Sequence, residues 1–197
     1  MDVLHQSQLL SKEIYTLICG REAPVSLRGS IAAGSYDAVH EHHRSIVLLI
    51  EHHLIGSAFV LVRPMFDGCI NGLWATYLAT DDELERFAEG RQTINPVRTL
   101  NRLKKKDDGE LTKTLQRIYT EAWEHMSSYV HGGYIQVARR NAIEYIGSNY
   151  SSEEIDDMLR LANLMAILAA MEILSLLNDQ SFVEEEMDKI LAKYHVD

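Results

Sequence analysis

One apolar segment, residues 55–78, places the strongest constraint on how this chain can fold. Read as a helix of about seven turns, it carries Arg63, Asp67 and Asn71 at intervals of four residues. Residues spaced by four lie close to one stripe of a helix, and a buried charge without a partner is very costly. We therefore expect Arg63 and Asp67 to form a buried or half-buried charged pair between helices, on a helix that Pro64 interrupts.

Two glycines in this segment indicate where a neighbour comes close to its backbone. Gly68 and Gly72 are also four residues apart, so both leave the same part of the helix surface without a side chain. We expect a neighbouring helix or an aromatic ring to lie against them. The bulky residues of the segment form its packing surface: Leu61, Phe66, Ile70, Leu73 and Trp74.

The remainder of the chain predicts helices and no sheet. No stretch sustains the alternation of a strand, and the 197 residues include only three prolines. We expect an all-α fold in a single domain, 1–197, with a core bundle at about 30–178. The expected helices span residues 2–19, 30–53, 55–78, 80–90, 96–106, 110–131, 134–146, 152–178 and 182–194. Capping boxes, in which a Ser or Thr precedes a Glu by three residues, begin three of them, at Thr80, Ser151 and Ser181.

The helix expected at 152–178 is apolar on all sides between Leu164 and Met171. Such a helix must be covered all round. Two arrangements satisfy this requirement: a place at the centre of the bundle, or a subunit interface. We expect a homodimer with residues 158–177 as the main contributor to the interface.

The charge of the chain is unevenly distributed. The net charge of −10 argues against a general nucleic-acid coat, but residues 91–117 contain eight basic and three acidic residues. A local basic stripe is compatible with a phosphate-bearing ligand, although such a stripe is more often a solvated helix face.

The sequence predicts a soluble, cytoplasmic protein without cofactor or metal. Cys19 and Cys69 have no metal or redox spacing, which is typical of reduced thiols. The first residues lack the features of a signal peptide. The longest apolar runs carry charged side chains, so we expect no membrane span.

The histidines are the candidates for chemistry. Glu41-His42-His43 recurs as Glu51-His52-His53 on one expected helix, and Asp37, His40 and His43 share one sector of it. Two ligands one turn apart can hold a metal when another helix supplies a third. The paired Glu-x-x-His motifs of di-iron bundles are missing, however. A solvated polar face with one or two histidines hydrogen-bonded inward is the preferred interpretation.

The helix expected at 110–131 carries a second set of candidates. Its packing seam includes His125, which we expect to be buried and hydrogen-bonded. Beside the seam, a polar stripe ends at His131, which two glycines follow. With Arg139 and Arg140 further on, His131 can serve as a general acid or base beside a phosphate, or simply cap its helix.

Several of these motifs resemble a group of uncharacterised bacterial all-helical proteins. The matching features are Arg63-Pro64-Met65-Phe66-Asp67, Gly72-Leu73-Trp74, Tyr129-Val130-His131-Gly132 and the start of the pattern at His43. More distantly, the chain resembles the HEPN superfamily, which includes abortive-infection and toxin ribonucleases. The resemblance implies a HEPN-like helical bundle with additional terminal helices. Those enzymes use Arg-x4-6-His from two protomers; this spacing is absent here, since Arg44–His52 and Arg117–His125 each have seven intervening residues.

Two functions follow as expectations. The first is an RNA-directed effector of a bacterial defence or toxin–antitoxin system, acting as a metal-independent ribonuclease in a dimer. The second is a non-catalytic helical dimer that binds a partner protein or a small ligand. The candidate catalytic residues are His131, Arg63, Arg139 and Arg140. The candidate binding residues are Asp67, Asn71, Trp74, His43 and Tyr129.

Overall fold

The computed structural model describes residues 2–22, 25–141, 146–177, 185, 189–190 and 192–194. Over these residues the regular structure is all helical, and an isolated bridge between Asn141 and Ile146 is the only β feature. The all-α prediction is therefore confirmed. The described helices are α1 Val3–Ile18, α2 Leu27–Glu51, α3 Ile55–Tyr77, α4 Asp81–Ala88, α5 Pro96–Lys106, α6 Glu110–Val130, α7 Tyr134–Ala138 and α8 Ser152–Leu176.

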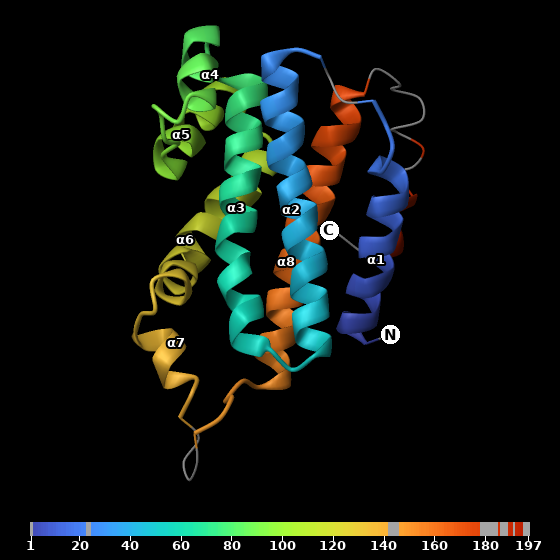
Figure 1. Ribbon diagram of the computed structural model, residues 1–197, viewed down its shortest axis with the longest axis vertical. Helices are drawn as coiled ribbons and strands as arrows, with labels where there is room; N and C mark the ends of the chain where they lie inside the picture. The colour runs from blue at the N-terminus through green and yellow to red at the C-terminus, as the bar shows by residue number, and fades with distance from the viewer. Residues whose placement is uncertain are drawn as a thin grey trace.

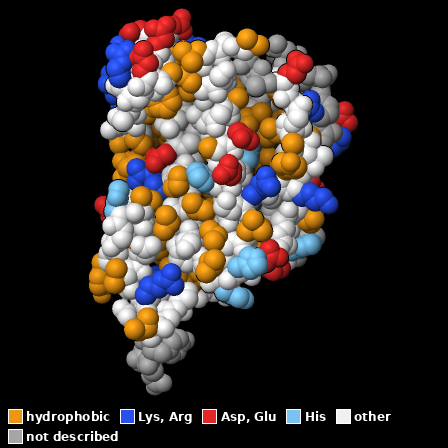
Figure 2. Space-filling model, in the orientation of Figure 1, with side chains coloured by type: hydrophobic (Ala, Val, Ile, Leu, Met, Phe, Trp, Pro, Cys, Tyr) orange, Lys and Arg blue, Asp and Glu red, His pale blue; other side chains and the backbone are white. Residues whose placement is uncertain are grey.

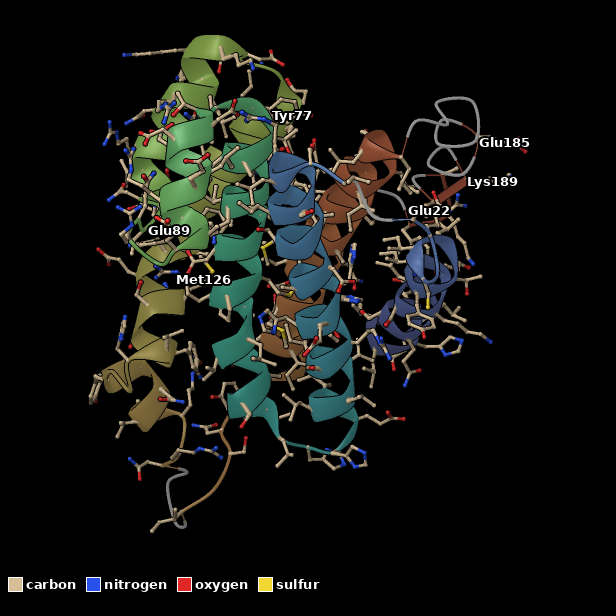
Figure 3. The ribbon with its side chains drawn as sticks, turned by 45° about the horizontal axis from the view of Figure 1, so that its top comes forward. Glu22, Tyr77, Glu89, Met126, Glu185 and Lys189 are labelled. Atoms are coloured by element: carbon tan, nitrogen blue, oxygen red, sulfur yellow. The ribbon has the colours of Figure 1, made fainter. Side chains whose placement is uncertain are left out.

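Three long helices, α2, α3 and α8, form the centre of the molecule (Figure 1). Helix α1 covers α2 and α8 on one side, and α6 packs on α3 on the other. Helices α4 and α5 lie at one end of the long axis and α7 at the opposite end (Figure 1). Figure 3 shows the two outer layers in another view, with Met126 and Glu89 on the α4–α6 side and Glu22 on the α1 side.

Polar side chains align α2 with α8. Residue numbers fall along α2 as they rise along α8, so the two helices are antiparallel. These cross-links are His43 Nε2 to Asn163 Oδ1 at 2.8 Å, His40 Nε2 to the Ala166 carbonyl at 3.0 Å, and Tyr36 Oη to Glu172 Oε2 at 3.3 Å. Tyr77 of α3 donates a second hydrogen bond, of 2.9 Å, to the same Glu172 oxygen. Burial raises the pKa of Glu172, while the two tyrosine hydrogen bonds oppose the rise.

The sequence predicted that a neighbouring helix or an aromatic ring lies against Gly68 and Gly72 of α3, and the structure shows both kinds of contact. A Cβ atom at Gly68 would lie 2.7 Å from Val39 Cγ2 and 3.1 Å from the Ser35 carbonyl oxygen, so a neighbouring helix, α2, contacts this position. A Cβ atom at Gly72 would lie 2.3 Å from Cε1 of Tyr36, so an aromatic ring covers the second position. The two glycines therefore set how closely α3 can approach α2.

Helix α3 is continuous through Pro64, which corrects the expected interruption. A proline inside a helix removes one backbone hydrogen bond and costs about 3 kcal/mol. Buried residues before and after it, Val62, Met65 and Phe66, hold both halves of the helix in the core. Their packing keeps the helix in one piece despite the missing bond.

Helix α8 occupies the centre of the bundle. Ten of its residues are buried, among them Leu159, Met165 and Leu174. By length and composition alone, α8 is the one described helix apolar enough to cross a membrane, yet over half of its most apolar window is buried inside the chain. An outward stripe remains half-buried, formed by Leu161, Leu164, Leu168 and Met171.

Most predicted helix boundaries agree with the structure. Capping boxes begin α4 at Thr80 and α8 at Ser151, and Pro96 opens α5. The predicted end of α7 is wrong, because the helix ends at Ala138 whereas the sequence predicted a helix to residue 146. The chain turns back there, and the Arg139 and Arg140 carbonyls accept hydrogen bonds from Asn149 and Gly147. The capping box at Ser181 and most of the helix expected at 182–194 lie outside the described residues.

Candidate functional site

Arg63 is held at the contact between α3 and α6. Its Nε donates to both carboxylate oxygens of Asp67, at 3.1 and 3.0 Å, and its Nη1 donates to Ser127 Oγ at 2.7 Å. The guanidinium carbon lies 3.4 Å from the centre of the Trp123 ring. The Arg63 and Asp67 side chains are 16% and 38% exposed, so the predicted half-buried pair is present. It lies within one helix, however, and not between helices; α6 supplies Trp123 and Ser127 as the partners from outside.

The predicted binding residues of α3 lie in different surroundings, although Asp67 is paired with Arg63. Asp67 and Asn71 line a shallow, open groove of about 450 Å³ between α2 and α3. Trp74 is buried and packs on Phe87 of α4, with ring centres 5.4 Å apart. Its side chain therefore supports the core and does not line this groove.

His131 lies at the exposed C-terminal end of α6. Its backbone N–H donates to the Ser127 carbonyl at 3.1 Å, and Gly132 follows with a φ of +63°. His131, Arg63, Arg139 and Arg140 do not line the groove between α2 and α3, nor a hollow beside α5, nor the cavity between α1, α2 and α8 described below. Arg139 forms an ion pair with Glu154 at the start of α8.

Tyr129 belongs to an aromatic cluster near this end of the molecule. Its ring centre lies 5.0 Å from that of Phe59 and 6.5 Å from that of Tyr150. Burial raises the pKa of Tyr129, the neighbouring Tyr150 adds to the rise, and Arg139 opposes it. Arg140 Nη2 and Tyr150 Oη approach the start of α3, 3.1 and 3.3 Å from where a Cβ atom at Gly56 would lie.

The sequence predicted a buried histidine on α6, and this prediction is wrong. His125 is exposed, although its expected neighbours on the seam, Leu115 and Ile118, are buried. The buried stripe of α6 continues through Met126 and Tyr129, so it passes beside His125. One position of rotation along the helix is enough to move a side chain from the core to solvent.

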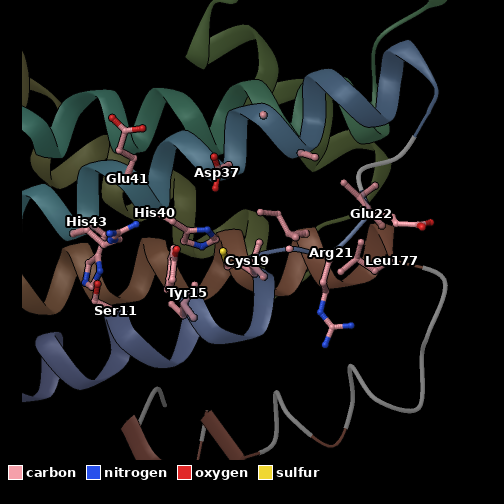
Figure 4. Close-up of a pocket in the computed structure, with 18 of the residues that line it drawn as sticks. Ser11, Tyr15, Cys19, Arg21, Glu22, Asp37, His40, Glu41, His43 and Leu177 are labelled. Carbon is pink, nitrogen blue, oxygen red and sulfur yellow. The ribbon is translucent and has the colours of Figure 1, made fainter.

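A cavity of about 580 Å³ lies between α1, α2 and the C-terminal part of α8 (Figure 4). We refer to it as the α1–α2–α8 cavity. Its apolar wall comes from α1 and α8, with Ile14, Ile18, Ile173, Leu176 and Leu177. Its polar wall comes mainly from α2, with Ser30, Asp37, His40, Glu41, His43 and Arg44. Gly34 of α2 also lines it, and a Cβ atom there would have nothing within 4 Å.

Two histidines of this wall, His40 and His43, are buried and hydrogen-bonded inward to α8, in agreement with the preferred interpretation of this part of the chain. His40 is 7% exposed and His43 is 1% exposed. Burial lowers the pKa of His40, against the opposing effects of its bond to the Ala166 carbonyl and of Asp37. Burial also lowers the pKa of His43 to about 4, while its bond to Asn163 opposes the shift. Both rings are therefore neutral at pH 7.

One buried ring nitrogen of His40 has no hydrogen-bond partner among the described residues. A carbonyl oxygen only accepts hydrogen bonds, so the His40 nitrogen facing Ala166, Nε2, carries the proton. The other nitrogen, Nδ1, is then an acceptor. It is buried, and within the described part of the chain no group donates to it.

Cys19 and Tyr15 form the α1 side of the cavity rim. A hydrogen bond with Cys19 raises the pKa of Tyr15, and the Arg44 guanidinium lies 4.7 Å from the centre of the Tyr15 ring. Cys19 is exposed, whereas Cys69 is buried and burial raises its pKa to about 12. Cys19 is therefore the thiol that reagents in solution can reach.

The sequence contained a signal for His40 and His43. The buried residues of α2 recur at helical spacing, from Tyr36 and Val39 to Ile46 and Ile50, and both histidines fall on this stripe. No comparable signal marked the cavity, because it depends on how α1 docks beside α2. Among the described residues, no group of three His, Cys, Asp or Glu side chains is arranged to hold a metal ion.

Comparison with known proteins places this fold in a family. Residues 36–196 match the family of unknown function DUF6988. The chain belongs to DUF6988. The DUF6988 match covers the α2–α3–α8 centre, while α1, which closes one side of the cavity, precedes the matched residues. No curated protein and no solved structure matches this DUF6988 chain.

Proposed function

We propose that this protein is a non-catalytic binding module that takes a small molecule into the α1–α2–α8 cavity. The observation that carries the proposal is a cavity of about 580 Å³ with an apolar wall from α1 and α8 and a polar wall from α2. Small-molecule sites have volumes of about 300–1,000 Å³ and combine an apolar lining with a few placed polar groups. This cavity has both properties.

The protonation of the wall favours binding over acid–base catalysis. A general acid or base works best when its pKa lies near the operating pH. Burial moves the pKa values of His40 and His43 below their ordinary range, so neither ring exchanges protons readily near pH 7. Their Nε2 atoms are bonded to α8, so the two neutral rings hold the cavity wall in a fixed position.

Filling the cavity tests the proposal. Gly34→Leu places a side chain in open space next to the cavity, so it should occupy the volume without a clash. Ala38→Leu is the matched control, because Gly34 lines both the cavity and the groove between α2 and α3, whereas Ala38, also exposed on α2, lines the groove but not the cavity. The readout is the fluorescence of N-phenyl-1-naphthylamine, a neutral dye that brightens in apolar sites.

We expect the wild-type protein and Ala38→Leu to bind the dye and Gly34→Leu to lose at least tenfold in affinity. Protection of Cys19 from Ellman's reagent should follow dye binding, since Cys19 lines the same cavity. Equal dye binding by all three proteins, or none by the wild type, would overturn the proposal.

A second candidate is the RNA-directed effector implied by the HEPN resemblance. The specific observation in its favour is an exposed end of the molecule at α6 and α7. Tyr134 is 84% exposed, and His131 and Arg140 are exposed on either side of it in the chain. Figure 2 shows a basic side chain beside hydrophobic ones over α7. Single-stranded RNA binds to such surfaces by base stacking and phosphate contacts.

The basic stripe of residues 91–117 does not extend this surface. Its helix α5 lies at the end of the molecule opposite α7 (Figure 1). Two of its cations, Arg102 and Lys106, donate to the backbone carbonyls of Leu78 and Tyr77. An RNA site at α7 would therefore depend on a few local contacts.

Binding and cleavage of a fluorescent single-stranded RNA test this second candidate. Tyr134→Ala should weaken binding at least fivefold, and His131→Ala should abolish any cleavage while leaving binding intact. Val97→Ala, at an exposed apolar position on α5, serves as the control. RNA binding that Tyr134→Ala leaves unchanged would refute the assignment to this end of the molecule.

A further inference from the structure

We propose that the ligand of the α1–α2–α8 cavity is a short apolar peptide with both termini free, held by its ammonium group at Asp37 and by its carboxylate at Arg44. This inference rests on the proposed binding function and adds the chemical class of the ligand. It excludes ligands that carry a single charge, and it excludes the terminus of a folded protein, which offers only one charged end.

Two groups of opposite charge in the polar wall have no ion-pair partner. Asp37 and Arg44 both line the cavity, and both side chains are exposed on α2. Among the described residues, no ion pair joins either of them to another side chain, and they do not pair with each other. Both charges are therefore accessible to a ligand that enters the cavity.

Helix α1 sets the position of the Arg44 guanidinium. The guanidinium carbon lies 4.7 Å from the centre of the Tyr15 ring, so Arg44 reaches from α2 to the α1 side of the cavity. Contact with the ring uses the face of the guanidinium, whereas its five N–H donors lie in its plane. Its edge can therefore hold a carboxylate through two parallel hydrogen bonds. Arg21, the other cation of the lining, already donates to the Leu17 carbonyl, so Arg44 is the carboxylate site.

Asp37 is the site for the ammonium group. Its carboxylate lies close enough to the buried His40 ring to oppose the fall in the pKa of His40, which places it beside the inner wall of the cavity. Glu22 and Glu41 of the lining add negative charge, and this charge favours an ammonium group over a second anion.

The separation of the two sites sets the length of the ligand. Asp37 and Arg44 are seven residues apart on α2, which corresponds to roughly 10 Å of helix rise. An extended peptide spans about 3.3–3.6 Å per residue, so about three residues bridge this distance. The charged groups of a free amino acid share one carbon, and they are too close together to reach both sites.

The apolar wall and the two charged sites act on the same ligand. Ile14 and Ile18 of α1 and Ile173 and Leu176 of α8 match apolar side chains of the peptide. An apolar ligand with one charge would displace water from both sites and pair only one of them, and a charge that loses water without gaining a partner is costly. A ligand with both charges pairs both sites.

Four forms of one peptide provide matched probes. Leu-Ala-Leu carries both charges, its N-acetyl form carries only the carboxylate, its C-terminal amide carries only the ammonium group, and the doubly blocked form carries neither. Affinity is measured by isothermal titration calorimetry and by displacement of N-phenyl-1-naphthylamine.

We expect the wild-type protein to bind Leu-Ala-Leu at least tenfold more tightly than any blocked form. Asp37→Asn should remove the preference for the free peptide over its N-acetyl form and keep the preference over the amide. Arg44→Gln should do the reverse. Glu124→Gln, at an exposed carboxylate of α6 outside the cavity lining, is the matched control for the loss of a charge and should bind all four forms as the wild type does.

The comparison of the four peptides needs only the wild-type protein, so the inference stays testable should a variant fail to fold. Similar affinities for the four forms, or tightest binding of a blocked form, would overturn the ligand class and leave the binding function standing. Dye binding without displacement by Leu-Ala-Leu would also overturn the ligand class, as would peptide binding that Gly34→Leu leaves unchanged. Failure of the dye to bind the wild type, or equal dye binding by Gly34→Leu, would instead remove the binding function on which the inference rests.

Discussion

Gly72→Ala is the substitution whose effect follows most directly from the packing of α3 on α2. The added Cβ atom would lie 2.3, 2.4 and 2.7 Å from three carbons of the Tyr36 ring. That ring is fully buried, and its hydroxyl donates to Glu172 on α8. The ring has no free space to rotate into, so α2 and α3 must separate or the hydrogen bond must break.

The change in the free energy of unfolding caused by Gly72→Ala combines opposing contributions. Alanine favours a helix interior over glycine by about 1 kcal/mol, whereas overpacking a core costs about 1–3 kcal/mol. Weakening the hydrogen bond to a buried carboxyl group adds about 1 kcal/mol or more. We expect a net loss of about 2 kcal/mol in the free energy of unfolding, which corresponds to a melting temperature lower by about 4–8 °C.

Gly34→Ala is the matched control, on α2. It gains the same helix preference, about 1 kcal/mol, but its Cβ atom meets nothing within 4 Å, so the melting temperature should rise by a few degrees. Both variants are compared with the wild type by urea and thermal unfolding monitored by circular dichroism. A Gly72→Ala protein as stable as Gly34→Ala would refute the close approach of Tyr36 to α3.

Three further predictions concern other parts of the molecule. Arg63→Met should lower the free energy of unfolding in urea by about 1–3 kcal/mol, less than for a fully buried ion pair, because Asp67 is 38% exposed; an unchanged midpoint would contradict the Trp123 and Ser127 contacts. Burial lowers the pKa of His43 to about 4, below its ordinary value of 6.5. Between these pH values the unfolded chain binds a proton that the folded chain does not. The free energy of unfolding therefore falls as the pH decreases from 6.5 to 4, by at most about 3 kcal/mol. His43→Gln should flatten this part of the stability profile in urea titrations at successive pH values. The outward stripe of α8 has the 3-4-3 spacing of a coiled-coil seam, so light scattering at micromolar concentration should give twice the chain mass, and Leu164→Glu should halve it; a monomeric wild type would exclude this dimer.

The fold was largely predictable because its signals are local. Helix lengths, capping boxes and the proline that begins α5 are set by neighbouring residues, and the structure has them where the sequence placed them. The errors arose where distant packing decides the outcome. Pro64 does not interrupt α3, because buried residues on both sides hold it. Helix α7 ends at Ala138, and the returning chain bonds to the carbonyls of Arg139 and Arg140 just after it.

The candidate site was harder to predict for a geometric reason. A helix presents a new face at each residue, so His42 and His43 differ by about 100° in direction, and only the buried stripe of α2 distinguishes them. Likewise His125 was placed on the seam of α6, whereas Met126 occupies it. The volume between α1 and α2 is a property of their docking, and neither helix carries a periodic signal for it.

The polar residues of α8 connect the fold with the site. In a helix that is apolar nearly all round, Asn163 and Glu172 are costly unless a covering helix offers them partners. Helix α2 offers His43 to Asn163 and Tyr36 to Glu172. Because the order of the two pairs is opposite along the two helices, these bonds fix an antiparallel alignment. His40 lies between these two positions, and the same alignment brings its Nε2 to the Ala166 carbonyl. The hydrogen bonds that align the two helices therefore also fix the tautomer of His40, and so they determine that its remaining nitrogen, Nδ1, is a buried acceptor.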